Sequence, residues 1–253
     1  MADFRSRVLA GETLIGSFSD LASPLAVELL GRAGMDWAVL DLEHGAATEA
    51  DLLALLYAAG STQMAPIVRP PSAERLRVGR ALDLGAAGIM LPQLQTIEQV
   101  REAVSYLRYP PVGIRGVALR TRGAGLGAVS HGDVARVVNE RIVGIVQIES
   151  AGAVAAAEEI ASLDEVDVLF VGPADLSHTL GVPGRFDERV YLDALETVVA
   201  ATRRHGKAAG ILLYDAGDLE RHVEIGFRFI GLGSEGSFVS AGAGAMLRAA
   251  GRP

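Results

Sequence analysis

Eight short apolar runs recur along the chain, and helical patterns lie between them; this alternation constrains the fold more than any other feature. The runs cover 14–19, 37–43, 65–69, 88–93, 142–149, 168–173, 208–214 and 229–235. Eight strands that alternate with helices in a chain of 253 residues are typical of a (β/α)8 barrel. The sequence therefore predicts an α/β fold, with residues 1–253 forming a single TIM-barrel domain.

The segments between the strands carry signals for helix ends. Ser23 is a candidate N-cap, and Pro24 follows it at the first helical position. Thr48 and Thr96 precede two further helical patterns. An open doubly wound sheet is the structural alternative, but it usually has a glycine-rich phosphate loop after its first strand. The first strand here runs into FSDLASP, without GxGxxG, which favours the barrel.

The charge and the residue usage restrict the possible partners. The net charge of −8 disfavours nucleic acid and anionic membranes as partners. The absence of cysteine excludes disulfides, thiolate catalysis and cysteine-bound zinc. No apolar run is long enough to span a membrane, and the first 16 residues lack the apolar core of a signal peptide. We expect a cytoplasmic protein that acts on small molecules.

Charged and polar side chains gather where the predicted strands end. In barrels of this kind the active site lies at the carboxyl ends of the strands. The residues at these positions are Asp41, Glu43, His44, Arg69, Gln93, Gln147, Glu149, Asp175, Tyr214, Asp215, Ser234 and Glu235.

Glu149 and Asp175 end neighbouring strands and form a candidate metal site. Two carboxylates together with water suit Mg²⁺ or Mn²⁺. Gln147 lies two residues before Glu149 on the same strand, so both side chains face the same side. The long apolar helical segment AGAVAAAEEIASL must cover the other side, which leaves the barrel interior for Gln147 and Glu149. The alternative is that each carboxylate caps the next helix or pairs with a surface arginine. We favour the metal site because the two carboxylates come from adjacent strand ends.

His44 and Arg69 are candidates for proton transfer and charge stabilisation. A histidine at the rim is suited to act as a general base near neutral pH, although it can also be a solvated loop residue. Arg69 lies within VRPP, where proline stiffens the backbone. It can hold a carboxylate or stabilise an enolate, or it can pair with Asp41 or Glu43.

Two glycine-rich segments are further candidates for ligand contacts. Residues 113–133 form a long segment without clear periodicity, in which Arg115, Arg120, Arg122 and His131 can meet an anionic substrate or a neighbouring subunit. Residues 231–236 follow the last strand, where barrels often bind phosphate, but glycine-rich turns are also common without a ligand.

Six motifs in this order resemble the HpcH/HpaI family of metal-dependent pyruvate aldolases. They are VLDLEHG, IVRP, LDLGAAGIMLPQ, YPPVGIRG, VQIES and VGPADLS, and the similarity extends from about Leu14 to Gly236. The resemblance implies a barrel whose eighth helix is exchanged with a neighbour, in a homo-hexamer built as a trimer of dimers. It also implies a class II aldolase that adds the enolate of pyruvate, or of hydroxypyruvate, reversibly to an aldehyde.

The resemblance also implies a role for each matching residue. Glu149 and Asp175 would bind the divalent cation, which would be Mg²⁺ or Mn²⁺, with Co²⁺ also possible. Gln147, the backbone amide of Ala174 and the cation at Asp175 would hold the oxygens of pyruvate. His44 would be the base, Arg69 would bind and stabilise the enolate, and Asp83 would raise the basicity of the histidine. Asp83 follows a predicted helix, however, which places it at the opposite end of the barrel. We expect acceptor specificity from residues 113–133, from the region of Leu212 and Tyr214, and from the subunit contact.

The lysine count favours a metal over a Schiff base. Aldolases activate a ketone with one or the other, and the only lysine, Lys207, opens a strand at the amino-terminal face.

Two other functions remain open. One is a metal-dependent oxaloacetate decarboxylase or citramalyl-type lyase, and the other is a non-catalytic barrel that binds an acidic metabolite.

Overall fold

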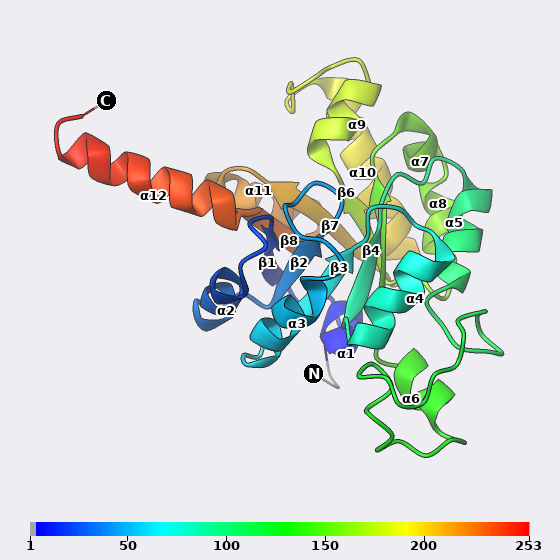
Figure 1. Cartoon of the computed structure of the whole chain (residues 1–253). Helices are drawn as coiled ribbons and strands as arrows, with labels where there is room; N and C mark the ends of the chain where they lie inside the picture. Colours follow the sequence, from blue (N-terminus) through cyan, green and yellow to red (C-terminus); the bar gives the residue numbers. More distant parts are fainter. Residues whose placement is uncertain (1–3, 253) are drawn as a thin grey trace.

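The computed structural model describes residues 4–252 and has eight parallel strands that close into a barrel in sequence order (Figure 1). This architecture confirms the predicted (β/α)8 fold. The strands are β1 (Leu14–Ser19), β2 (Trp37–Asp41), β3 (Ala65–Arg69), β4 (Gly88–Leu91), β5 (Val143–Ile148), β6 (Val168–Val171), β7 (Ala208–Leu213) and β8 (Phe227–Ser234). Each of them lies within a predicted run, except for the first two residues of β8.

Helices surround most of the barrel (Figure 1). They are α1 (Phe4–Leu9), α2 (Pro24–Arg32), α3 (Leu52–Gly60), α4 (Arg75–Leu84), α5 (Ile97–Ser105), α6 (Val134–Asn139), α7 (Ala151–Ala155), α8 (Ala157–Ala161), α9 (Pro173–Thr179), α10 (Arg189–Arg204), the 3-10 helix η1 (Ala216–Asp218), α11 (Leu219–Ile225) and α12 (Glu235–Ala249). Within the described residues, no helix is both long and apolar enough to cross a membrane.

The helix starts follow the local signals at two of three positions. The Ser23 side chain accepts a hydrogen bond from the amide of Ala26, and Thr96 forms a capping box with Gln99. The third helix, α3, begins only at Leu52, because Asp51 accepts hydrogen bonds from the amide and hydroxyl of Thr48 and closes a separate turn before it.

Apolar side chains fill the barrel interior below the carboxyl ends of the strands. Trp37 stacks on Phe229 with 4.2 Å between ring centroids, and Phe170 meets the edge of the same pair. A second, larger apolar layer lies between the strands and the surrounding helices. These two layers fix the strands rigidly, so the side chains at the strand ends are held in defined positions.

Helix α1 closes the amino-terminal end of the barrel. Phe4 packs against Phe229, and Arg5 forms an ion pair with the fully buried Asp167 at 2.8 Å. Arg108 and the amide of Gly144 also bind this carboxylate. Among residues 4–252, α1 thus covers one end of the barrel, and the cavity lies at the other, carboxyl end.

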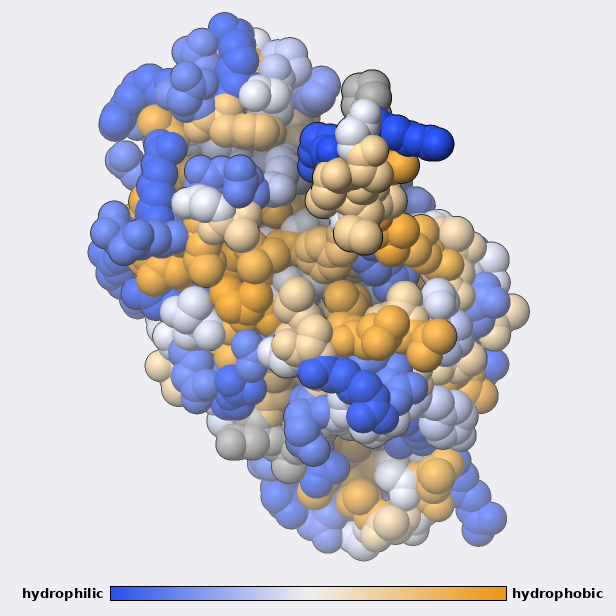
Figure 2. All heavy atoms as spheres, turned by 90° about the vertical axis from the view of Figure 1, so that its left-hand side faces the viewer, coloured by the Kyte–Doolittle hydropathy of each residue, from blue (hydrophilic) through white to orange (hydrophobic). Residues whose placement is uncertain are grey.

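Helix α12 points away from the barrel that precedes it (Figure 1). Of its residues, only Glu235 is buried in the single chain. Apolar side chains along it are exposed to solvent: Phe238, Val239, Met246 and Leu247. Figure 2 shows this side of the molecule, where apolar surface spreads beside the helix. Leu25 and Leu29 of α2 and Tyr57 of α3 are among the exposed apolar residues of the helices nearby.

Candidate active site

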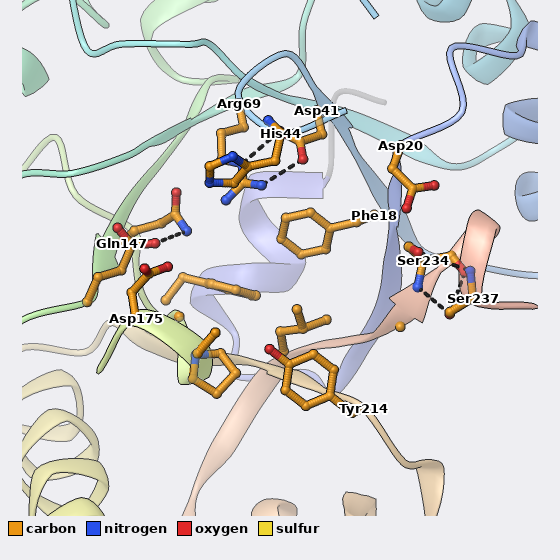
Figure 3. A pocket seen from close by; sticks show the side chains of 17 residues that line it. Phe18, Asp20, Asp41, His44, Arg69, Gln147, Asp175, Tyr214, Ser234 and Ser237 are labelled. Carbon is orange, nitrogen blue, oxygen red and sulfur yellow. Dashed lines mark hydrogen bonds and ion pairs between the residues drawn. The ribbon is translucent and has the colours of Figure 1, made fainter. Parts of the chain in front are cut away.

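A cavity of about 370 Å³ opens at the carboxyl ends of the strands (Figure 3). It brings together side chains from the ends of seven strands or from the loops after them, as the barrel topology requires. Its lining residues are Phe18, Asp20, Asp41, His44, Arg69, Gln147, Glu149, Phe170, Gly172, Pro173, Ala174, Asp175, Leu212, Tyr214, Gly233, Ser234 and Ser237.

Asp41 and Arg69 form a buried pair on one wall of the cavity. The strands that carry them are neighbours, and the two residues are directly opposite in the register. Nε and Nη2 of Arg69 donate to the two carboxylate oxygens of Asp41 at 2.9 and 2.7 Å. Nη1 of Arg69 lies 3.2 Å from Oε2 of Glu43. Both ion pairs considered for Arg69 from the sequence are therefore present, and they fix its guanidinium at the cavity.

The turn after β2 presents His44 at the mouth of the cavity. Oδ1 of Asp41 accepts the amides of Glu43 and His44, which closes the turn. The imidazole is 65% exposed, and its Nε2 lies 3.9 Å from Oε2 of Glu43. His44 thus combines access to solvent with a position beside the cavity, as a group that exchanges protons requires.

Glu149 directly follows β5, and Asp175 lies in the first turn of α9 after β6; both line the cavity. The side-chain amide of Gln147 donates to Oε1 of Glu149 at 2.6 Å. Burial, followed by the negative charges of Asp175 and Glu43, raises the pKa of Glu149 to about 7. Gly172 allows this packing, because a Cβ atom there would lie 2.8 Å from the Glu149 carboxylate.

The donor atoms on this wall fit a divalent cation that keeps open positions. Within the described part of the chain, no group of three or more His, Cys, Asp or Glu side chains is arranged to hold a metal ion. Mg²⁺ commonly uses only one or two carboxylates, with water and substrate as its other ligands. Oε1 of Gln147 is buried without a hydrogen-bond partner beside the carboxylates. A cation held by Glu149 and Asp175 would balance two carboxylates that otherwise repel each other.

Ala174 and Leu212 also lie where the sequence predicts substrate contacts. Ala174 is in the first turn of α9, where backbone amides lack helical partners and can bind an anionic oxygen. Leu212 lies on β7, two residues before Tyr214, and both side chains line the cavity. They form an apolar wall next to the predicted pyruvate contacts.

The structure does not bring Asp83 to the cavity of its own chain. Asp83 lies near the end of α4, so it is at the amino-terminal end of the barrel. There its carboxylate accepts a 2.8 Å hydrogen bond from Arg115, and its carbonyl accepts the amide of Gly123. No residue of 113–133 lines the cavity either. Within one chain, Asp83 and this segment therefore form one unit that is separate from His44.

Lys207 is also remote from the cavity. Its Nζ donates to the carbonyl of Leu163 at 3.0 Å, at the amino-terminal end of β7. Its pKa is lowered by burial, but no carbonyl substrate in the cavity can reach it.

Sequence reasoning missed several residues that line the cavity, among them Phe18, Asp20 and Ser237. Phe18 and Asp20 lie at the end of β1 and directly after it, so the rule that placed the other rim residues applies to them too. Ser237 lies on α12, and only the path of the chain after β8 brings it to the cavity.

The fold and the site together define the class of protein: a (β/α)8 barrel with an acidic site at the carboxyl ends of its strands. The family model for HpcH/HpaI aldolase/citrate lyase matches residues 14–241. The chain belongs to this family and is a carbon–carbon lyase of the aldolase type.

Curated relatives share almost the whole chain. The 5-keto-4-deoxy-D-glucarate aldolase of Klebsiella pneumoniae subsp. pneumoniae is 38% identical over 239 residues, which cover 94% of this chain and 93% of the relative. The enzyme of the same name from Salmonella paratyphi C is 38% identical over 232 residues, covering 92% of this chain and 90% of the relative.

Solved structures share the fold. A HpcH/HpaI aldolase/citrate lyase family protein from Burkholderia cenocepacia is similar with a TM-score of 0.92 and 34% identity, covering 99% of both chains. The citrate synthase SbnG is similar with a TM-score of 0.88 and 27% identity, covering 99% of this chain and 98% of the other.

Proposed function

We propose that the chain is a metal-dependent aldolase that converts pyruvate, or hydroxypyruvate, to its enolate and adds it reversibly to an aldehyde. The observation that carries the proposal is one cavity that holds the carboxylates of Glu149 and Asp175, the fixed guanidinium of Arg69 and the exposed imidazole of His44. In the reverse direction the enzyme cleaves 4-hydroxy-2-oxo acids. The aldolase name of the Klebsiella relative supports this reaction class.

The positions of the donors in the cavity support the proposed substrate half of the site. Glu149 and Asp175 hold the divalent cation, with Mg²⁺ or Mn²⁺ as the expected ions. The chemistry that such a cation supplies when bound is the polarisation of the keto group of the substrate. Gln147 and the amide of Ala174 bind and orient the oxygens of pyruvate, and Leu212 covers the methyl side.

The proton transfers are assigned to residues of the β2 turn and of β3. His44 removes a proton from the methyl group of pyruvate, directly or through a water molecule. Arg69 stabilises the negative charge that the enolate oxygen gains. The methylene carbon then forms a bond with the aldehyde carbon, and the aldehyde oxygen takes up a proton, which balances the proton lost at the methyl group.

The second candidate is a metal-dependent lyase that acts on oxaloacetate or on a citramalyl-type thioester. The similarity in fold to the citrate synthase SbnG supports this second candidate function. The same cavity can serve, because both reactions pass through an enolate. Incubation with oxaloacetate and with hydroxy-keto acids, followed by product analysis, separates the two: faster turnover of oxaloacetate favours this second candidate.

We also propose that α12 covers the barrel of a second copy, within a homo-hexamer. The exposed apolar residues of α12 and α2 support this proposal, because such residues are usually buried in an interface. In that assembly, Asp83 would raise the basicity of His44 in a neighbouring chain, because Asp83 and His44 are far apart within one chain.

Methyl exchange of pyruvate in D2O tests the proposed function without knowledge of the acceptor. The protein is incubated with pyruvate and Mg²⁺ or Mn²⁺, and then with a chelator, while NMR follows the methyl signal. We expect loss of the signal that depends on the metal. Tight metal-dependent binding of pyruvate without any exchange would support a non-catalytic barrel instead.

A further inference from the structure

The end of the cavity opposite the metal pair has its own polar lining. Asp20 comes from the loop after β1, and Ser234 and Ser237 come from the junction of β8 and α12. In Figure 3 these three residues lie on one side, Gln147 and Asp175 lie on the other, and Phe18 and Tyr214 lie between them. A substrate held at the metal pair would extend its far end towards Asp20.

Asp20 is fixed on two sides, so its carboxylate has a defined position. Its Oδ1 accepts the amide of Gly236 at 3.1 Å, and its backbone carbonyl accepts the amide of Ala46 at 2.9 Å. A Cβ atom on Gly236 would lie 3.1 Å from both carboxylate oxygens, so the glycine permits this close approach. Oδ2 of Asp20 has no hydrogen bond or ion pair within residues 4–252 and can accept a hydroxyl.

The start of α12 is already occupied by groups of the chain itself. A helix N-terminus normally attracts carboxylates through its free amides. Here the amide of Gly236 binds Asp20, and that of Ser237 binds the hydroxyl of Ser234. Glu235 is buried and accepts the amide of Leu21 at 2.8 Å, which adds a second carboxylate close by.

Within the described residues of one chain, no lysine or arginine lies at the Asp20 end of the cavity to bind an acidic tail. Among the residues 4–252 that line the cavity, Arg69 is the only lysine or arginine, and Asp41 and Glu43 already pair with it. A carboxylate next to Asp20 would meet like charge and find no free cation on this chain. A hydroxyl would find an acceptor in Oδ2 of Asp20, whereas the Ser237 hydroxyl already donates to the carbonyl of Ser234 and accepts its amide.

We propose that Asp20 makes the enzyme select polyhydroxy aldehydes without an acid group over aldehyde acids as acceptors. This inference rests on the proposed aldolase function and names the acceptor class for it. The enzyme would then cleave 2-oxo-3-deoxy sugar acids with one carboxylate in preference to those with two. It would thus differ from relatives named for glucarate, which is a sugar diacid.

The test compares two acceptors that differ only at the far carbon: glyceraldehyde and tartronate semialdehyde, with pyruvate as donor. The variants are Asp20→Asn and, as a second substitution if that protein folds poorly, Asp20→Ser. Asp193→Asn on the outside of α10 is the matched control, since it removes an exposed carboxylate away from the cavity. Pyruvate methyl exchange is measured on every protein to report the donor half alone.

For the wild type we expect kcat/KM for glyceraldehyde to exceed that for tartronate semialdehyde by about 10-fold or more, because a hydrogen bond to a charged acceptor favours the hydroxyl. Asp20→Asn should lower this ratio by about 10-fold, and methyl exchange should stay within about twofold. The Asp193→Asn control should retain the wild-type ratio.

Three other results would contradict the inference, and each has a different meaning. A wild type that prefers tartronate semialdehyde shows that a cation from elsewhere serves this end of the cavity. An unchanged ratio in both Asp20 variants, with normal methyl exchange, removes Asp20 from specificity and leaves the proposed function intact. Absence of methyl exchange and of aldol product in the wild type refutes the proposed function, and the Asp20 inference falls with it.

Discussion

Arg69 and Asp41 sit opposite each other on β3 and β2, and two hydrogen bonds of 2.9 and 2.7 Å join the guanidinium to both carboxylate oxygens. The same carboxylate binds the amides of Glu43 and His44. Asp41 therefore positions both the arginine and the turn that carries the histidine, although it would not itself react with substrate.

Asp41→Asn should weaken the fold and the reaction together. A buried charge that loses its partner costs about 3 kcal/mol or more of the free energy of unfolding. Misplacement of Arg69 should lower kcat by about 100-fold, with metal affinity retained. Urea unfolding, steady-state kinetics and metal titration measure the three effects. Asp133→Asn, which removes an exposed ion pair with Arg136, is the control and should change stability by less than about 1 kcal/mol. A normal kcat in Asp41→Asn would contradict the positioning role.

Glu149→Gln should stabilise the metal-free protein at pH 8 but not at pH 5. The raised pKa of about 7 means that the folded state holds a proton which the unfolded state, with a pKa near 4.5, has released. This contribution to stability is present below pH 4.5 and is lost as pH rises through 7, where wild-type Glu149 is a buried charge. The gain at pH 8 should approach about 3 kcal/mol.

Urea unfolding in the presence of a chelator at both pH values measures this difference. Glu158→Gln is a suitable control, because hydrogen bonds from Arg204 and His205 lower the pKa of Glu158, and its removal should bring no gain at pH 8. Equal effects of Glu149→Gln at both pH values would show that the Glu149 pKa is not raised.

Lys207→Arg should retain aldolase activity within about twofold, because the lysine lies outside the cavity and at the other end of the barrel. Treatment of the wild type with borohydride and pyruvate, followed by mass spectrometry, should find no covalent adduct on the lysine. A pyruvate adduct on Lys207 together with an inactive arginine variant would replace the metal route with a Schiff base.

Mixing His44→Ala with Asp83→Asn subunits tests whether Asp83 acts on a neighbouring chain. Each variant alone should be weakly active. After denaturation and refolding together, some sites would combine an intact His44 with an intact Asp83 of another chain, and activity should recover to about a quarter of wild type if chains associate at random. No recovery, with both variants still associating, would limit Asp83 to its contact with Arg115.

Met246→Glu should dissociate the assembly, because it places a charge among the exposed apolar residues of α12. Light scattering after size-exclusion chromatography measures the mass, and we expect a shift from hexamer to smaller species. Val190→Glu on α10 is the matched control, as both residues are exposed in one chain. An unchanged mass for Met246→Glu would show that α12 is not part of the contact.

The local pattern of the sequence determined the strands and most of the site. Apolar runs of strand length end in charged residues, as expected where buried parallel strands end at a functional rim such as that of a barrel. This reasoning placed His44, Arg69, Gln147, Glu149 and Asp175 at one end of the molecule, and all five line the cavity. Helix caps such as Ser23 and Thr96 also follow from the sequence, since their hydrogen bonds join residues only three apart.

Other features depend on contacts between residues far apart in the chain. The pairing of Asp20 with Gly236 spans 216 residues, and nothing near either residue indicates it. Likewise, local signals indicate a helix after β8 but not its direction. The apolar residues of this helix could pack on the barrel of their own chain or on that of a partner. Asp83 shows the same limit. A sequence motif identifies the residue as a candidate, but the order of strands and helices places it at the end of the barrel away from His44. Sequence fixes short-range geometry, whereas the closure of the barrel decides which distant side chains share a site.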